Sequence, residues 1–118
     1  MTALYDVAAI GNAIVDVIAQ CDDAFLDAQG LVKGSMALID TTRAASLYDA
    51  MAAGIEASGG SAANTLAGVA SFGGKAAFIG KVADDQLGEV FAHDMRAIGG
   101  DFTTPPLAEG PATAQCLI

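Results

Sequence analysis

The 118-residue chain contains no tryptophan, one histidine and only five lysine and arginine residues. Its fourteen acidic residues give it a formal net charge of -9 at pH 7. A chain with so few cations repels a phosphate backbone, which argues against nucleic-acid binding. Because 53% of the residues are hydrophobic and 16% are charged, the composition predicts one small folded domain and excludes disorder.

Long uninterrupted apolar runs are also missing. The first six residues lack the basic segment of a secretion signal, and Asp6, Asn12 and Asp16 interrupt the apolar stretch between residues 4 and 21. The sequence therefore predicts a soluble cytoplasmic protein with no membrane partner.

Cysteine and histidine are too scarce for a metal or redox motif. Cys21 and Cys116 lie at opposite ends of the chain, with no CxxC pattern and no histidine nearby. We expect both thiols to be free and buried, because cysteine behaves as a small apolar residue. The single histidine, His93, is expected on the solvated side of a helix, and no metal site is predicted.

Hydrophobic patterning predicts an α/β fold. Expected strands cover residues 5–11, 14–19, 36–39, 76–80 and 112–118, and expected helices cover residues 40–57, 61–72 and 84–98. The first strand is expected at the centre of the sheet, buried on both faces, and the next two are expected to pair antiparallel. Helix caps are expected at Asp40 or Thr41, at Ser61, and at Asp84 or Asp85.

Two common phosphate-binding motifs are absent from the sequence. A dinucleotide-binding fingerprint needs three glycines after the first strand, where this chain has only Gly11. A Walker A loop needs serine or threonine after its lysine, where Lys75 is followed by Ala76. Neither motif supports a nucleotide site here.

A different group of residues has the chemistry of a polyol site. Asn12 and Asp16 follow the first strand, and the segment Gly59-Gly60-Ser61-x-x-Asn64 precedes an alanine-rich helix. A carboxylate accepts two hydroxyl hydrogen bonds at once, an amide both donates and accepts, and glycines let backbone N–H groups approach a ring. Each piece also has a structural alternative, since Asp16 could face solvent and the glycine segment could be only a loop and helix cap.

Taken together, these motifs resemble the N-terminal third of the PfkB-family, or ribokinase-like, carbohydrate kinases, most closely the adenosine kinase branch. The resembling positions are residues 11–16, 59–65 and 79–88, together with Gly74 and Thr113. The resemblance implies a ribokinase-like doubly wound α/β sheet with a small lid of β-strands. We expect the lid strands near residues 15–21, 35–39 and 112–118.

The resemblance also implies roles for individual residues. The sugar hydroxyls would be held by Asn12, Asp16, Gly60, Ser61 and Asn64. A base pocket would be lined by Met36, Leu38 and Ala114. No catalytic residue is expected in this chain, because the family's Gly-Ala-Gly-Asp segment, whose aspartate acts as the base, is not among its residues.

The implied activity is ATP-dependent phosphorylation of a nucleoside or sugar hydroxyl with Mg²⁺, at sites mostly outside this chain. Adenosine, phosphorylated at its 5' hydroxyl, is the first expected substrate, because Ser61-Ala62-Ala63-Asn64 differs from the Lys-Gly-Ala-Asn typical of ribokinases. A ribokinase- or fructokinase-type sugar kinase is the alternative.

The final residues, 112–118, carry no terminating signal, so we expect further polypeptide to complete the fold, either as C-terminal sequence or as a second chain. The chain alone is then expected to be inactive. Another possibility is a non-catalytic binding or assembly fragment, in which exposed lid strands pair between subunits of a homodimer.

Overall fold

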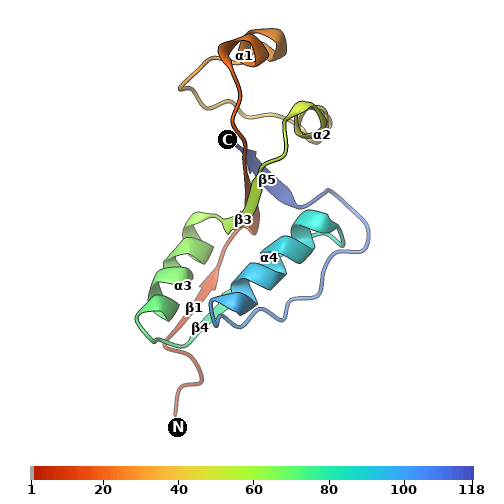
Figure 1. Cartoon of the computed structure of the whole chain (residues 1–118). Helices are drawn as coiled ribbons and strands as arrows, with labels where there is room; N and C mark the ends of the chain where they lie inside the picture. Colours follow the sequence, from red (N-terminus) through yellow and green to blue (C-terminus); the bar gives the residue numbers. More distant parts are fainter. Residues whose placement is uncertain (1) are drawn as a thin grey trace.

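A computed structural model describes residues 2–118. In chain order its elements are β1 (Val7–Ile10), β2 (Ile14–Ile18), α1 (Asp23–Gln29), α2 (Thr41–Ala50), β3 (Ile55–Gly59), α3 (Ser61–Ser71), β4 (Ala76–Ile79), α4 (Gln86–Ala97) and β5 (Ala114–Leu117). The strands form a parallel pair, β1–β4, and a three-stranded sheet in the order β3–β2–β5 (Figure 1). This arrangement confirms the predicted α/β class.

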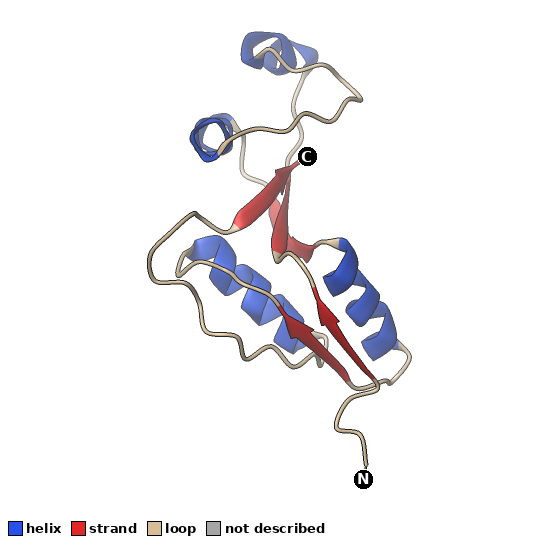
Figure 2. Ribbon diagram, turned by 180° about the vertical axis from the view of Figure 1, so that it is seen from behind, coloured by secondary structure: helices blue, strands red, loops and turns tan. Residues whose placement is uncertain are grey.

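The core lies between the β1–β4 pair and the helices α3 and α4. Both helices lie in front of the strands in Figure 1 and behind them in Figure 2, so they cover the same face. The rings of Phe78, Phe91 and Phe102 meet there with centroids 5.3 to 5.8 Å apart. Leu66 of α3 and Met95 of α4 are fully buried against them. One aromatic cluster therefore joins both helices to the strands.

The opposite face of the β1–β4 pair is open in the described part of the chain. Ile10 and Ile79 pair with each other in the register and are 80% and 49% exposed. Ala8, which shares this face with Ile10 because side chains alternate along a strand, is exposed as well. The prediction that the first strand is central and buried on both faces is therefore wrong for residues 2–118, because no helix covers this face and β1 pairs with β4 alone.

In the three-stranded sheet, β2 is the central strand. It pairs antiparallel with β3, which places Asp16 opposite Ala57, and parallel with β5, which places Asp16 opposite Cys116. Val15 and Val17 point into the core and are 0% and 4% exposed. Because side chains alternate along a strand, Asp16 and its two cross-strand neighbours share the face turned away from the core.

The predicted strand at residues 36–39 does not exist, and the predicted helix at residues 40–57 is too long. Residues 35–39 form no regular element, α2 ends at Ala50, and β3 takes the place beside β2. Gly54, the residue before β3, lies close to the end of β2. A side chain at this position would collide with the carbonyl of Ile18, so the close pairing of β3 with β2 needs a glycine here. The other two predicted lid segments, residues 15–21 and 112–118, overlap β2 and β5.

Two of the three predicted helix caps are confirmed. The Asp40 carboxylate accepts a hydrogen bond from the backbone N–H of Arg43 at 2.7 Å, and Asp85 accepts one from Gly88 at 2.8 Å. Ser61 does not cap α3, because the helix begins at Ser61 itself and its N-cap is Gly60, which has no side chain. Helix α1 was not predicted; Asp22 caps it through the N–H of Phe25.

Both cysteines are free, as predicted, but both are exposed, so the expectation of buried thiols is wrong. Cys116 is exposed because β5 turns that position away from the core. Among residues 2–118, every helix is too short or too polar to cross a lipid bilayer.

Candidate functional site

Asp16 lies in the middle of the open face of the three-stranded sheet. Ile14 and Ile18 flank it on β2, and Ala57 and Cys116 lie beside it on β3 and β5. Asp16 is the one charged residue among the strand positions that share this face. It is partly buried, so its carboxylate is shielded from water on one side and accessible on the other. A carboxylate in such a setting can accept hydroxyl hydrogen bonds with less competition from solvent.

The two glycine motifs, nearly fifty residues apart in sequence, lie against each other. A side chain at Gly60 would come within 3.0 Å of the carbonyl oxygen of Asn12. One at Gly11 would come within 2.7 Å of the Ala62 Cβ atom. These close approaches bring the end of β1 and the start of β2 to the start of α3. Gly60 also has a φ of 91° and a ψ of 146°, a conformation almost confined to glycine, so substitution there strains the backbone as well as the site.

The Asp16 carboxylate lies over the same glycine segment. A Cβ atom at Gly59 would be 2.5 to 2.7 Å from the three carboxylate atoms of Asp16. From there the chain enters α3, where the Gly60 carbonyl accepts the backbone N–H of Asn64 at 2.9 Å. Asn12, Ser61 and Asn64 are exposed. The structure thus gathers Asn12, Asp16, Gly60, Ser61 and Asn64 around the junction of β2, β3 and α3.

The three residues predicted for a base pocket are not gathered in the same way. Ala114 lies on the Asp16 face, opposite Ile14 in the register. Met36 and Leu38 are 82% and 93% exposed in the segment between α1 and α2. This segment lies at the end of the molecule away from α3 (Figure 1). It lacks strand pairing in residues 35–39, so nothing holds these two side chains on the sheet face.

Comparison with known proteins gives this arrangement a context. An adenosine kinase from Sinorhizobium meliloti is 61% identical, superposes with a TM-score of 0.81 and matches 98% of this chain. A probable sugar kinase from Rhizobium etli is 52% identical, with a TM-score of 0.80 and 96% of this chain covered. The chain resembles ribokinase-like kinases. Its fold is ribokinase-like, as the motifs predicted.

The likeness covers only part of each relative. The chain spans 35% of the adenosine kinase and 34% of the probable sugar kinase. A curated relative, fructokinase-1 from Oryza sativa, is 41% identical over 80 residues, which are 68% of this chain and 24% of the fructokinase. No protein-family model matches the chain.

Two residues that lie next to Asp16 were not predicted from the sequence as part of the site. Cys116 lies directly beside Asp16, and Gly59 lies beneath the Asp16 carboxylate. The alternation Ala114, Gln115, Cys116 was a usable signal for the first, because a strand places Ala114 and Cys116 on one face. For Gly59 the sequence carried no signal that separates it from Gly60.

A hydrogen-bonded cluster joins β5 to α4. The Asp85 carboxylate accepts the hydroxyl of Thr113 at 2.7 Å and the Thr113 N–H at 2.9 Å, besides capping α4 through Gly88. The Thr113 hydroxyl oxygen in turn accepts the N–H of Ala83 at 2.9 Å. Thr113 is 4% exposed. This cluster holds β5, and with it Ala114 and Cys116, against the body of the molecule.

The charge of Asp85 is stabilised by these contacts. Burial by itself raises the pKa of Asp85, but the hydrogen bonds from the Thr113 hydroxyl, the Thr113 N–H and the Gly88 N–H outweigh it. The pKa therefore lies below its ordinary value of 3.8.

A second carboxylate fastens β3 just before the glycine pair. Asp94 of α4 accepts the backbone N–H of Ser58 at 2.8 Å. The neighbouring His93 is solvated, as predicted, with a side chain that is 78% exposed. Its Nδ1 atom lies 3.2 Å from the other Asp94 oxygen. Helix α4 thus positions both strands that flank β2.

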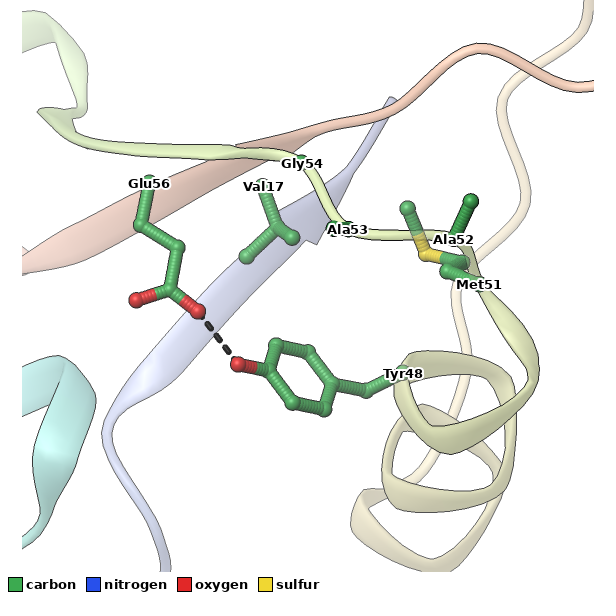
Figure 3. A pocket seen from close by; sticks show the side chains of 7 residues that line it. All are labelled: Val17, Tyr48, Met51, Ala52, Ala53, Gly54 and Glu56. Atoms are coloured by element: carbon green, nitrogen blue, oxygen red, sulfur yellow. Dashed lines mark hydrogen bonds between the residues drawn. The ribbon is translucent and has the colours of Figure 1, made fainter.

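A small cavity of about 140 Å³ lies on the other face of the sheet (Figure 3). Val17, Met51 and Gly54 contribute to its lining, and the Tyr48 hydroxyl donates a hydrogen bond to the Glu56 carboxylate across it. That bond raises the pKa of Tyr48. Because Val17 and Glu56 alternate with Asp16 and Ala57, this cavity backs the sheet and is separate from the Asp16 site.

A larger groove of about 830 Å³ runs between α4 and residues 101–106 and contains none of the eight predicted site residues.

Proposed function

We propose that this chain supplies the substrate-binding part of an ATP-dependent kinase that phosphorylates a hydroxyl of a nucleoside or sugar. The observation that carries the proposal is the position of the Asp16 carboxylate over Gly59, beside Gly60 and the start of α3. A carboxylate close to a glycine-lined helix start combines hydrogen-bond acceptors with backbone N–H donors, the two kinds of group that bind sugar hydroxyls.

In this proposal the two Asp16 oxygens accept the hydrogens of a vicinal diol. Charge-assisted bonds of this kind contribute roughly 1.5 to 3 kcal/mol each. Gly60 has no side chain, so the first N–H groups of α3 are left open to a ligand oxygen. The exposed Asn64 amide can donate to one hydroxyl and accept from another. Together these groups orient the ring and leave the acceptor hydroxyl free for phosphorylation.

The residues of this chain do not fit ATP with Mg²⁺. Within residues 2–118 no three histidine, cysteine or carboxylate side chains gather into a metal site. The whole sequence has five lysine and arginine residues against fourteen acids, and it carries neither the Walker A loop nor the dinucleotide-binding fingerprint. In the proposal, ATP, Mg²⁺ and the base that takes the hydroxyl proton are therefore held by polypeptide outside this chain.

Adenosine is the first proposed substrate, and its 5' hydroxyl the acceptor. The 61% identity to an adenosine kinase over nearly the whole chain supports it. The fructokinase relative supports the alternative of a free sugar. The adenosine and free-sugar hypotheses differ in whether a purine base contributes to binding.

A ligand panel tests this choice. The chain is titrated at millimolar concentrations of adenosine, inosine, ribose and fructose, and the amide resonances of Asn12, Asp16 and residues 59–64 are followed by NMR. We expect adenosine to bind most tightly, and 2',3'-dideoxyadenosine, which keeps the base but lacks the diol, to bind at least about tenfold more weakly. Tighter binding of fructose than of adenosine would favour the sugar kinase. Absence of a response to all ligands contradicts the proposal.

A non-catalytic assembly role is a second candidate, favoured by the open β1–β4 face. Ile10 and Ile79 are exposed there side by side, and exposed apolar patches of this kind often mark protein contacts. Such a role predicts a concentration-dependent dimer that Ile10→Lys abolishes, whereas Val32→Lys, at an equally exposed apolar position outside the sheet, leaves it intact. Sedimentation velocity measures this directly, and a monomer at all concentrations excludes a homodimer through this face.

A further inference from the structure

We infer that Gly59 is a positioning residue for Asp16: it provides the space in which the Asp16 carboxylate lies pointed toward Gly60 and the start of α3. The inference rests on the proposed function, in which that carboxylate holds the sugar hydroxyls.

The space above Gly59 is occupied by the Asp16 carboxylate, whose atoms are the nearest ones to the position of a Cβ atom at Gly59. A Cβ atom built on Gly59 would lie 2.5 Å from Asp16 Oδ2 and 2.7 Å from both Cγ and Oδ1. All three distances are shorter than real non-bonded contacts of a Cβ atom, which essentially never fall below 3.0 Å. Any larger residue at position 59 therefore displaces the carboxylate.

The backbone itself does not require a glycine at this position. Gly59 is the last residue of β3 and is absent from the positive-φ glycines of residues 2–118, which include its neighbour Gly60. Alanine can adopt the extended conformation of a strand without strain. Gly60 thus has the φ of 91° that favours glycine, whereas Gly59 leaves the space that the Asp16 carboxylate occupies.

The strand register shows in which direction the Asp16 side chain extends over Gly59. Asp16 is paired with Ala57, whereas Gly59 is paired with Ile14. The Asp16 side chain therefore reaches diagonally along the sheet, away from its own partner and toward the end of β3. That direction leads to Gly60 and α3, where the other proposed sugar contacts lie. If position 59 were filled, Asp16 would have to adopt another staggered rotamer that points elsewhere.

The Asp16 carboxylate can move to another position without disturbing the core, because it is the free end of a short side chain on the open face of the sheet. A substitution at Gly59 is therefore expected to change the site while the fold persists. Gly68 offers a matched control, since it lies in α3 and a Cβ atom there meets nothing within 4 Å.

The test compares Gly59→Ala, Asp16→Ala, the double variant and Gly68→Ala in the 118-residue chain. Two quantities are measured: the ¹³C resonance of the Asp16 side-chain carboxyl, and the dissociation constant for adenosine and for ribose from NMR titration. We expect Gly59→Ala to shift the carboxyl resonance and weaken ligand binding by about tenfold or more, with the amide spectrum of the core unchanged. Gly68→Ala is expected to change neither quantity.

The double variant separates action through Asp16 from direct contact with the ligand. If Gly59 acts through Asp16, adding Gly59→Ala to Asp16→Ala causes no further loss of affinity. The inference is overturned if Gly59→Ala weakens binding as much in the Asp16→Ala background as it does alone. It is also overturned if the Asp16 carboxyl resonance is the same with glycine and alanine at position 59. If the unsubstituted chain binds neither ligand, the proposed function fails, and the carboxyl resonance still decides whether Gly59 positions Asp16.

Discussion

Replacing Asp16 by alanine is expected to raise the dissociation constant for a ligand with a vicinal diol by about a hundredfold or more. The carboxylate is the one charged group on an otherwise apolar sheet face, and the proposed site uses both of its oxygens. Losing two charge-assisted hydrogen bonds costs at least about 3 kcal/mol of binding free energy. NMR or calorimetric titration with adenosine measures the change.

The fold of the Asp16→Ala variant should remain intact, because Asp16 is partly exposed and faces away from the core. Asp49→Ala is the matched control: Asp49 is an exposed residue of α2, and its loss removes the same charge without touching the site. Equal affinity of the Asp16→Ala variant and the unsubstituted chain would exclude a diol contact at this position.

Replacing Asp85 by alanine is expected to lower the free energy of unfolding by about 2 to 4 kcal/mol. The substitution removes the N-terminal cap of α4 and leaves the buried Thr113 without the acceptor for its hydroxyl and its N–H. Loss of a cap costs about 1 kcal/mol, and a buried donor without a partner adds roughly 1 to 3 kcal/mol. Urea unfolding followed by circular dichroism measures the difference.

The same contacts predict how stability depends on pH. The pKa of Asp85 in the folded chain lies below the ordinary value of 3.8 that it takes when unfolded. Its contribution is therefore complete above the unfolded value and is lost as the pH falls through the lower, folded value. The Asp85→Ala variant should show a smaller loss of stability between neutral pH and acid than the unsubstituted chain.

Asp84→Ala provides the control for this pair of measurements. Asp84 carries the same charge one residue earlier, its side chain is exposed, and its only hydrogen bond in the described structure is made by its backbone N–H to Leu107. If Asp84→Ala destabilises the chain as much as Asp85→Ala, the loss of one negative charge explains the effect, and the Asp85–Thr113 hydrogen bonds do not.

The elements that could be predicted were those whose signals are local. Asp40 and Asp85 were expected to cap helices, and each accepts an N–H three residues ahead within its own turn. In α4, Leu87, Phe91 and Met95 recur at helical spacing, and the last two are fully buried. Ile14–Ile18 and Ala76–Ile79 were recognisable as strands from their apolar composition.

The partner of β2 could not be predicted in the same way. Residues 36–39 are all apolar, whereas Ile55–Gly59 has one isoleucine followed by a glutamate and three small residues, so composition favours the first segment as the strand. The second segment pairs with β2, with Gly54 close to Ile18 and Gly59 beneath Asp16, whereas residues 35–39 form no regular element. Strand pairing depends on contacts across the sheet, which composition alone does not record.

From the sequence alone came the α/β class, the ribokinase-like resemblance and the residues Asn12, Asp16, Gly60, Ser61 and Asn64, because these depend on residue type and short spacing. The tertiary structure alone decided that the carboxylate lies over Gly59, that Cys116 lies beside it, and that Met36 and Leu38 lie apart from both. Those facts follow from the register of β2 with β3 and β5, which is set by simultaneous packing of distant segments and has no signature within any one of them.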